Sequence, residues 1–442
     1  MSETLRSVGI DVGTTSTQLI LSELVVENQA GSFSVPEMEI AQRRILYKSE
    51  VYVTPLLSGD LVDAAALRQI ITREYERAGI SRDCVDTGAI IITGETSRKE
   101  NAAAVLRELS GFAGEFVVAT AGPDLESVLA AKGAGAVGYS ERTGERVLHM
   151  DIGGGTSNLA LIRDGKIVKT GCMNVGGRLI KFDKTGTITY LSPVLEEICI
   201  LRLGQTVTAQ DLETVARKLT QALEMAAGLR ETTDLLAKLW TKECGTLWES
   251  VPEPVTVSFS GGVADCINRE VPWLEYGDLG PVLGRAIRES RLCRSAYVLG
   301  SETIRATVIG AGCHSAQLSG STVFHRNVEF PLKNIPVAEF PEESPEEEPV
   351  VLAVEGFPGA TYDQVRALAE QIALRRKPGP VLVCIREDMA KALGQALALQ
   401  LGPEMPILCI DRVKLKPGDY LDVGSPVGPA LPVVVKTLVL DQ

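Results

Sequence analysis

Two short stretches of the sequence place a carboxylate directly before a turn rich in glycine. They are DVGTTSTQ at residues 11–18 and DIGGGTSN at residues 151–158, and each lies between two apolar runs. Glycine has no side chain to hold an anion away from the backbone, so such turns can present several N–H groups to a phosphate. A carboxylate beside them suits Mg²⁺, which binds few carboxylates and keeps several waters. The pair predicts two facing turns that clamp a triphosphate and its metal ion.

The roles follow from the residue types at these positions. Asp11 and Asp151 end their strands, and we assign both to the metal ion and to catalysis. Hydroxyl groups can add donors beside the amides, so the predicted phosphate-binding set is Gly13, Thr14, Thr15, Gly153, Gly154, Gly155 and Thr156. Either turn alone fits an ordinary hairpin equally well, because Asp and Gly are common turn residues. The repetition favours a nucleotide site.

A third glycine motif follows a predicted strand in SFSGGVAD, residues 258–265. Gly261 and Gly262 would let adenine and ribose lie against the backbone, and the following helix N-terminus would add donors. Two runs of small residues, KGAGAVG at 132–138 and IGAG at 309–312, allow close helix packing where two lobes hinge. We also include Gly310 and Gly312 among the nucleotide-binding residues. Each of these pieces is a weak signal alone.

The elements that must position these residues form a repeated pattern. The first segment has a strand–turn–strand unit and a third strand, and then alternates helices and strands; the expected elements lie at 7–25, 44–53, 63–78, 88–93, 98–110, 116–120 and 126–139. The second segment begins in the same way, with a hairpin that turns at Asp164–Gly165. A mainly helical stretch, a strand at 255–260 and a strand at 306–312 follow. We therefore expect an α/β fold of two duplicated βββαβα lobes around a nucleotide cleft.

The expected domains follow from these elements and from one change in composition. The first lobe covers 1–140 and the second 141–340, with a helical insertion at about 193–250. PEESPEEEP at 341–349 is an acidic linker, because a block of like charges with proline does not pack. A small α/β module covers 350–442, and its buried strands favour completion of the second lobe over contact with a partner.

Composition limits the classes of protein that remain. The formal net charge of −13 argues against nucleic acid and anionic membranes as partners. No apolar run reaches the roughly 18 residues of a membrane-spanning helix, and the first residues lack a signal-peptide pattern. Nine cysteines without a Cys-x-x-Cys pair and three scattered histidines predict free thiols and no zinc site. We expect a cytoplasmic protein.

The ordered set of motifs over residues 7–315 resembles the superfamily of actin, sugar kinases and heat-shock chaperone ATPases. The resemblance implies ribonuclease H-like, actin-like ATPase lobes with ATP and Mg²⁺ in the cleft. Four further segments, GETSRKENAAAVL (94–106), DLESVLAAKGAGA (124–136), SETIRATVIGAGCHSAQLSGSTV (301–323) and KLKPGDYLDVGSPVGPALPVVVKTL (414–438), resemble the reactivating factors of ethanolamine ammonia-lyase, nearly end to end.

That second resemblance implies an ATP-dependent chaperone with slow ATPase activity. Its partner would be ethanolamine ammonia-lyase, from which it releases damaged cobalamin so that intact adenosylcobalamin can bind. It would act in ethanolamine breakdown, in the cytoplasm or at the bacterial microcompartment of that pathway. The oligomeric state stays open, with a homodimer among the states allowed.

Other members of the superfamily remain alternatives. A small-molecule kinase or an exopolyphosphatase would need a general base beside the terminal phosphate. Glu126 is the first candidate, because its spacing from the second turn is similar to that of the phosphatase family's base, and Glu95 is the second. A solvated glutamate is the simpler interpretation of both. An actin-like filament protein is the other alternative, whereas the iron–sulfur dehydratase activators lack support because no paired cluster cysteines occur.

Overall fold

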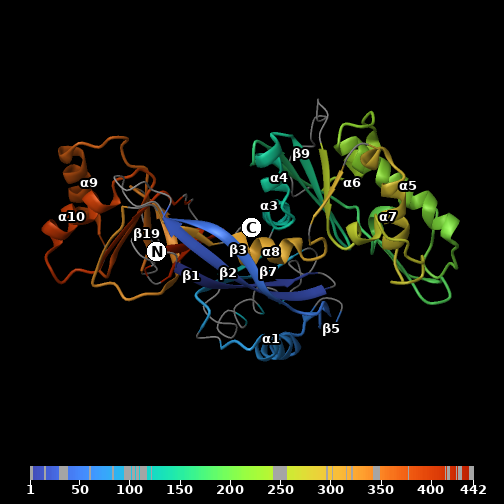
Figure 1. Cartoon of the computed structure of the whole chain (residues 1–442), viewed down its shortest axis with the longest axis horizontal. Helices are drawn as coiled ribbons and strands as arrows, with labels where there is room; N and C mark the ends of the chain where they lie inside the picture. Colours follow the sequence, from blue (N-terminus) through green and yellow to red (C-terminus); the bar gives the residue numbers. More distant parts are fainter. Residues whose placement is uncertain are drawn as a thin grey trace.

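The protein is described from a computed structural model of the whole chain (Figure 1). The structure describes residues 3–437 except for positions 14–15, 29–37, 59–60, 82–83, 94–100, 102–104, 106–108, 110–116, 121, 242–255, 295–296, 301, 315, 320–321, 342–348, 377, 414, 416–418, 425 and 427–430. Within these residues, no helix is long and apolar enough to cross a membrane. All eight described cysteines are free thiols.

A mixed sheet forms the first lobe. Its strands lie in the order β3-β2-β1-β7-β8, and β4 also pairs with β2. The bounds are β1 Glu3–Val12, β2 Ser16–Asn28, β3 Met38–Lys48, β4 Tyr52–Val53, β7 Thr87–Ile92 and β8 Val117–Thr120. β1 and β2 are antiparallel, whereas β7 lies parallel to β1 and β8 parallel to β7. A short pair of strands, β5 Leu56–Ser58 and β6 Leu61–Val62, leads into helix α1, Ala64–Ala78.

Helix α1 covers the outer face of this sheet (Figure 1). It begins at Asp63, whose side chain accepts a hydrogen bond from the amide of Ala66, and ends at Gly79 in the left-handed conformation. Its buried side chains recur at helical spacing and join the core beneath β1 and β7; they include Leu67, Ile71 and Tyr75. The helix predicted at 63–78 is confirmed.

The sheet of the second lobe repeats the first. Its order is β11-β10-β9-β14-β15, with antiparallel β9, β10 and β11 followed by parallel β14 and β15. The bounds are β9 Val147–Ile152, β10 Ser157–Arg163, β11 Lys166–Met173, β14 Thr256–Ser260 and β15 Tyr297–Leu299. The predicted hairpin turns at Asp164 and Gly165, both of which have positive φ. Strand for strand, the duplicated α/β fold is confirmed.

The outer face of the second sheet carries a larger core than the first. Helices α5 (Ala209–Ala226), α6 (Asp234–Leu239) and α7 (Gly280–Arg288) build it together with a hairpin of β12 (Ile180–Phe182) and β13 (Ile188–Leu191). The strands of this hairpin end before residue 193, and the described part of the predicted helical insertion at 193–250 contains α5 and α6. Residues 242–255 lie outside the described part of the chain.

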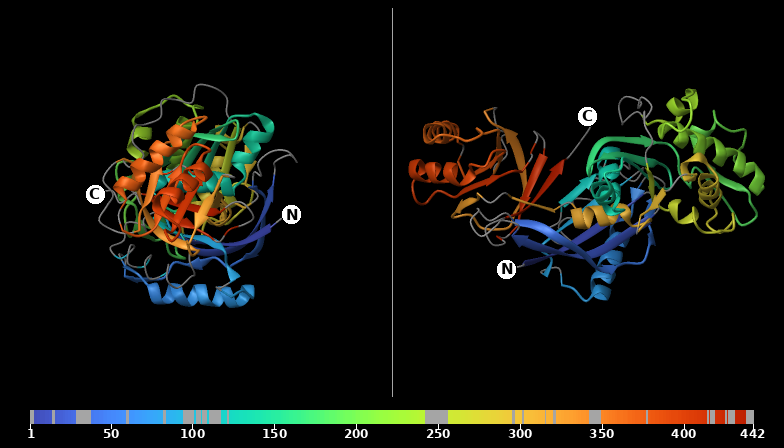
Figure 2. Two further views of the ribbon diagram at one scale, coloured as in Figure 1. Left: turned by 90° about the vertical axis from the view of Figure 1, so that its left-hand side faces the viewer. Right: turned by 45° about the horizontal axis from the view of Figure 1, so that its top comes forward.

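Helices α3 (Pro123–Gly133) and α8 (Ala306–His314) lie between the two lobes, and α4 (Ala136–Thr143) follows α3 beside the second-lobe sheet (Figures 1 and 2). The small-residue helix predicted at 126–139 is interrupted at Gly135, which has φ +80°. The strand predicted at 306–312 is wrong, because these residues form α8. A short apolar run without polar spacing does not distinguish a buried strand from a buried helix.

Glycines let α8 approach its two neighbours closely. A Cβ on Gly310 would lie 2.1 Å from the carbonyl oxygen of Leu129 in α3, and one on Gly133 would lie 1.9 Å from the carbonyl oxygen of Ala306. On the other side, a Cβ on Gly312 would lie 2.9 Å from the amide nitrogen of Gly9 in β1. Gly310 and Gly312 are therefore packing residues, and we withdraw their assignment to nucleotide binding.

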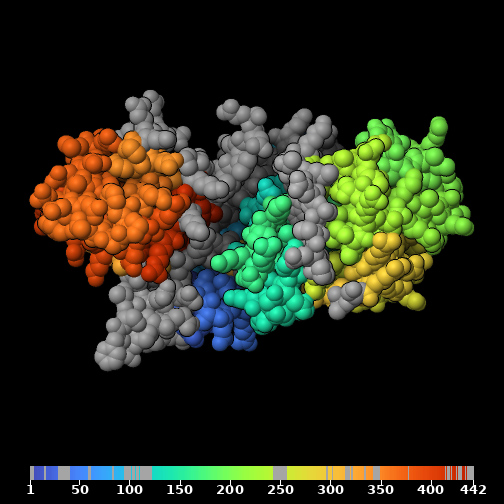
Figure 3. Space-filling model, turned by 90° about the horizontal axis from the view of Figure 1, so that it is seen from above, coloured from blue at the N-terminus to red at the C-terminus, as the bar shows by residue number. Residues whose placement is uncertain are grey.

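The C-terminal unit has a sheet of its own. Its eight strands lie in the order β16-β23-β22-β18-β19-β20-β21-β17, and two helices cover one face. The bounds are β16 Ala316–Leu318, β17 Phe324–Arg326, β18 Leu332–Glu339, β19 Val351–Val354, α9 Tyr362–Arg375, β20 Val381–Ile385, α10 Ala390–Leu401, β21 Ile407–Asp411, β22 Asp419–Val423 and β23 Pro432–Thr437. Figure 3 shows this unit and the helical part of the second lobe at opposite ends of the molecule.

This topology differs from the expected boundaries. The C-terminal strands add nothing to the second-lobe sheet, and the unit includes β16–β18, which precede the expected boundary at 340. β18 and β19 are parallel neighbours, so the acidic stretch 341–349 connects two strands of one sheet instead of two domains. Residues 342–348 of that stretch lie outside the described residues. The apolar runs indicate buried strands, but they do not show whether these strands extend the second-lobe sheet or form a sheet of their own.

The close contact of α3 with α8 gives a testable prediction. Gly133→Ala should lower the free energy of unfolding by roughly 1–3 kcal/mol, because the added methyl group meets rigid backbone. Chemical denaturation measures this change. Gly138→Ala in α4 is the matched control, since its only close atom is the flexible end of Arg142, and it should leave stability equal or slightly higher. An unchanged Gly133→Ala variant would contradict the packing role.

Candidate functional site

The two aspartates of the repeated motif occupy equivalent places in the two sheets. Asp11 lies near the end of β1, and Asp151 lies near the end of β9. Each is 8% exposed. Thr93, which follows β7, donates a hydrogen bond of 2.9 Å to Oδ1 of Asp11. Ser260 at the end of β14 donates to Oδ1 of Asp151, and Thr307 in α8 donates to its Oδ2 at 3.4 Å. Hydroxyl groups thus hold each carboxylate. They lie at the end of the neighbouring parallel strand, β7 or β14, and for Asp151 also in helix α8.

Burial dominates the electrostatics of these carboxylates. It raises the pKa of Asp11 from 3.8 to about 7, with a smaller contribution from the negative charge of Asp151 and an opposing one from Thr93. Burial also raises the pKa of Asp151 to about 6, against the hydrogen bonds from Ser260 and Thr307. Because the charge of Asp151 acts on Asp11, the two carboxylates lie within electrostatic reach of each other. A cation between them would satisfy both.

The turns that follow the aspartates close in the same way. The amide of Gly13 donates to the carbonyl of Ser16, and the amide of Gly153 donates to the carbonyl of Thr156, both at 2.9 Å. The carbonyls of Gly153 and Gly154 accept from the amides of Gly177 and Arg178. Because the C=O and N–H of one trans peptide point in opposite directions, the amides of Gly154 and Gly155 point away from that contact. This orientation is compatible with the predicted donation to a phosphate.

Two of the predicted phosphate-binding residues, Thr14 and Thr15, lie outside the described residues. Gly13 is buried, and the second turn, 153–156, is partly accessible. The structure therefore brings Asp11, Asp151 and the described parts of both turns to one place. Their roles toward a nucleotide stay predictions.

The third glycine motif lies against the end of β9. Gly261 has φ +88°, and a Cβ there would lie 2.3 Å from the carbonyl oxygen of Ile152, so only glycine fits. Gly262 is exposed, and the nearest atom to its Cβ position is the Ile304 side chain at 4.0 Å. One glycine thus sets the turn and the next leaves an open surface beside Asp151. The contact of this pair with adenine and ribose stays a prediction.

The first candidate base, Glu126, joins the same site. It lies in the first turn of α3 and is 7% exposed. Its Oε2 accepts a hydrogen bond of 2.7 Å from Nδ2 of Asn158, and Asn158 is the cross-strand partner of Asp151. The solvated-glutamate interpretation is wrong for Glu126. The second candidate, Glu95, lies outside the described residues.

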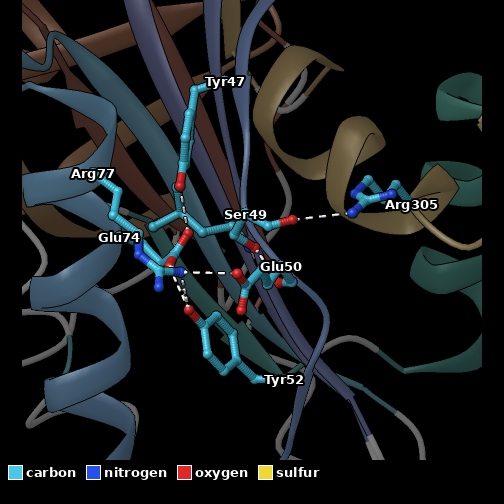
Figure 4. A network of polar contacts seen from close by, with 8 residues as sticks. Tyr47, Ser49, Glu50, Tyr52, Glu74, Arg77 and Arg305 are labelled. Carbon is cyan, nitrogen blue, oxygen red and sulfur yellow. Dashed lines mark hydrogen bonds and ion pairs between the residues drawn. The ribbon is translucent and has the colours of Figure 1, made fainter.

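Polar contacts support the first turn from behind, and Figure 4 shows the part of them at Ser49 and Arg305. The hydroxyl of Thr54 donates 2.7 Å to the carbonyl of Gly13 and lies 3.0 Å from the hydroxyl of Thr17. The segment that leads to Thr54 is fixed at Ser49, whose carbonyl accepts a hydrogen bond of 3.0 Å from Arg305, directly before α8. The network therefore joins the first turn to the helix that contacts Asp151.

The same segment is fixed to α1 through Glu74. This glutamate is fully buried and accepts hydrogen bonds from the hydroxyls of Tyr47 and Tyr52, while Arg77 pairs with it at 3.0 Å. Burial and the neighbouring Glu74 charge raise the pKa of Tyr47 to about 12, so its hydroxyl remains a donor at neutral pH. A buried carboxylate with this many donors is a rigid anchor.

Sequence patterns alone missed several members of the site. Thr93 and Thr307 come from elements 82 and 156 residues away from the aspartates that they contact, and no local signal marks them. Gln18 and Asn158 could have been found, since each is the last residue of a quoted motif and stands opposite its aspartate. Ser260 was inside the third quoted motif.

The sequence profile of the ethanolamine utilisation protein EutA matches residues 3–348 and 340–441. The chain belongs to the EutA family. Two curated members, each named ethanolamine ammonia-lyase reactivase EutA, come from Salmonella typhimurium and Escherichia coli. Each is 38% identical to this chain, and each comparison covers 98% of both chains. Among solved structures, a Ppx/GppA enzyme of Aquifex aeolicus is similar over 70% of this chain and 99% of its own, with 13% identity and a TM-score of 0.44.

The raised pKa of Asp11 predicts a pH dependence of stability. Between pH 3.8 and about 7 the folded chain holds a proton that the unfolded chain releases, so the free energy of unfolding falls as pH rises through this window. Asp11→Asn removes this loss. The variant should gain stability over the unchanged protein between pH 4 and pH 8, by at most about 4 kcal/mol.

Urea denaturation without nucleotide or metal ion measures this gain. Asp183→Asn is a control with the opposite sign, because hydrogen bonds from Thr185 and Thr187 lower the pKa of Asp183. A gain for Asp11→Asn that does not change with pH would contradict the assignment.

Proposed function

We propose that this EutA-family chain is an ATP-dependent reactivating chaperone of adenosylcobalamin-dependent ethanolamine ammonia-lyase. The observation that carries the proposal is its near full-length similarity to two curated ethanolamine ammonia-lyase reactivases. The two aspartate–glycine turns would supply the ATP site that this activity needs. Damaged cobalamin would leave the lyase in one nucleotide state, so that intact adenosylcobalamin can enter.

The nucleotide would lie between the two lobes. The residues that fit its phosphates are the amides of the two turns, and the open face at Gly262 fits the adenosine. Asp11 and Asp151 fit a hydrated Mg²⁺, which when bound would neutralise charge on the phosphates. Their raised pKa values support this role, because two buried carboxylates without a described basic partner gain most from a cation.

Glu126 is the group that would act on water. It lies on α3 beside Asn158, opposite the turn that would hold the terminal phosphate. A buried carboxylate in this place can accept a proton from an attacking water and orient it. The assignment favours phosphate hydrolysis over transfer to a small alcohol or acid.

Coupling to the lyase requires different affinities of the two nucleotide states. A shift of a complex from about 1:99 to 99:1 needs roughly 5.5 kcal/mol of differential binding. The chain has a route for such a signal: the Gly261 amide donates to the carbonyl of Thr303, and Thr307 in α8 donates to Asp151. Movement at the nucleotide would therefore reach α8, which lies against both lobes. The ethanolamine utilisation profile supports a place in ethanolamine breakdown, whereas microcompartment association rests on the sequence resemblance alone.

The first prediction tests the function itself. Ethanolamine ammonia-lyase inactivated with cyanocobalamin should regain deamination when mixed with this protein, adenosylcobalamin, ATP and Mg²⁺. Asp151→Asn should abolish recovery, because it removes a cation-binding charge while keeping the shape of the side chain. Wild-type protein without ATP is the control. Absence of recovery with the complete mixture would overturn the proposal.

The second prediction separates nucleotide binding from hydrolysis. Glu126→Gln should slow ATP hydrolysis roughly 10²-fold or more, since the amide cannot accept the proton. ATP-dependent binding to the lyase should persist, because the glycine turns and aspartates are unchanged. Phosphate release and lyase pull-down measure the two properties on one preparation. Unchanged hydrolysis would remove Glu126 from its role, and fast phosphate transfer to a small alcohol would favour a kinase.

A further inference from the structure

Two carboxamide side chains occupy matched positions beside the two aspartates. Gln18 is the cross-strand partner of Asp11, and Asn158 is the cross-strand partner of Asp151. Directly opposite residues of an antiparallel pair lie on the same face of the sheet, with Cβ atoms about 4.5–5.5 Å apart. Each carboxamide therefore stands next to its carboxylate, once in each lobe. Both are at least nine-tenths buried, with exposures of 2% and 4%.

The orientation of each amide group is fixed by chemistry. Nε2 of Gln18 donates to the carbonyl oxygen of Ile304 at 3.1 Å, and Nδ2 of Asn158 donates to Oε2 of Glu126 at 2.7 Å. Both partners are acceptors, so only the nitrogen atom can face them. The oxygen atoms must point elsewhere, and neither Oε1 of Gln18 nor Oδ1 of Asn158 has a partner among the described residues.

An unpartnered buried carbonyl is costly, by about 1–3 kcal/mol. It occurs here twice, at equivalent positions of a duplicated fold, and both times beside a site that we assign to a ligand. The missing partner must be a hydrogen-bond donor. In their ionised form the neighbouring carboxylates, Asp11 and Asp151, are acceptors as well. The described side chains beside each carboxamide oxygen then present oxygen atoms and no donor to it.

A hydrated divalent cation satisfies such a set. Its bound waters are strong donors, and Mg²⁺ keeps several of them. Among the described residues, no cluster of three or more His, Cys, Asp or Glu side chains could enclose a bare ion.

We propose that Gln18 and Asn158 are the outer ligands of the divalent cation that accompanies the nucleotide, and that their amide oxygens accept hydrogen bonds from its waters. The inference rests on the proposed nucleotide function. One carboxamide from each lobe would then accept hydrogen bonds from the waters of the same ion. Closure of the cleft and cation binding would be linked through both.

Mn²⁺ is the probe, because it also prefers oxygen ligands and its free form is measured by electron paramagnetic resonance. Binding of Mn²⁺ is titrated with a non-hydrolysable ATP analogue present, for the full-length chain and for single variants. Gln18→Leu and Asn158→Leu should weaken Mn²⁺ binding about tenfold or more, as loss of outer-shell partners does elsewhere. Gln69→Leu, at an exposed position of α1, is the matched control and should bind as the unchanged chain does.

Carboxylate variants separate the oxygen atom from the amide donor. Gln18→Glu and Asn158→Asp keep an acceptor oxygen but lose the donor to Ile304 or Glu126, and they should bind Mn²⁺ at least as tightly as the unchanged chain. If they bind as poorly as the leucine variants, the donors matter and the proposal is wrong. Leucine variants within about twofold of the unchanged chain would also overturn it.

Two further measurements separate a loss of cation binding from a loss of folding or of nucleotide binding. Melting temperatures of the ligand-free variants show whether each one folds, and the rise in melting temperature on adding Mn²⁺ with the analogue gives a second measure of binding. Affinity for the analogue in excess chelator should be the same in all folded variants. If the unchanged chain binds no nucleotide at all, the proposed function fails, and this inference fails with it. A normal nucleotide affinity with unaffected cation binding rejects the outer-ligand role alone.

Discussion

The burial of two carboxylates at equivalent places of the two lobes is the constraint on which the site depends. Asp11 and Asp151 end equivalent strands of facing lobes, both are nearly excluded from water, and neither has an ion-pair partner among the described residues. Their neighbours are hydroxyl groups, which orient the oxygen atoms without supplying charge. A pair arranged in this way favours protons or a cation over two free negative charges. This arrangement supports the proposal that a cation binds at the two aspartates.

The helices between the lobes connect the site of the two aspartates to both lobes. α8 contacts β1 of the first lobe through Gly312 and α3 through Gly310, and its Thr307 reaches Asp151 of the second lobe. The two glycine contacts bring backbone against backbone, whereas the Thr307 contact joins two side chains. The Glu74 network and Arg305 anchor the first turn to the start of the same helix (Figure 4). We therefore propose that charge at the aspartates is coupled to the angle between the lobes through α8.

The sequence predicts those features that are marked by a repeated motif or by regular spacing of apolar residues. Asp11 and Asp151 were found because the motif occurs twice, and the helix at 63–78 because its apolar residues recur at helical spacing. The strand expected at 306–312 failed, since a run of Ala, Val, Ile and Gly has no polar residues to show a period. Gly310 and Gly312 were assigned to the nucleotide because small residues suit both ligand approach and helix packing, and only the positions of Leu129 and Gly9 decide between the two.

The C-terminal unit shows a second limit of sequence patterns. Its buried strands were recognisable, but β16 and β17 are three residues long and carry no signal. They nevertheless form the two edges of the eight-stranded sheet. Strand partners across a sheet are chosen by tertiary packing, so the acidic stretch was interpreted as a domain boundary although the strands on either side of it pair.

Proton release on binding of ATP with Mg²⁺ tests the central claim most directly. Calorimetric titration at pH 6.5 in buffers of different ionisation enthalpy counts the protons released for each nucleotide bound. A cation between Asp11 and Asp151 must displace the proton that their raised pKa values hold, so we predict net release that disappears near pH 8.5 and is reduced in Asp11→Asn. Nucleotide binding with no proton release at pH 6.5, or with release unchanged by that substitution, would contradict the claim that these two carboxylates form one cation site.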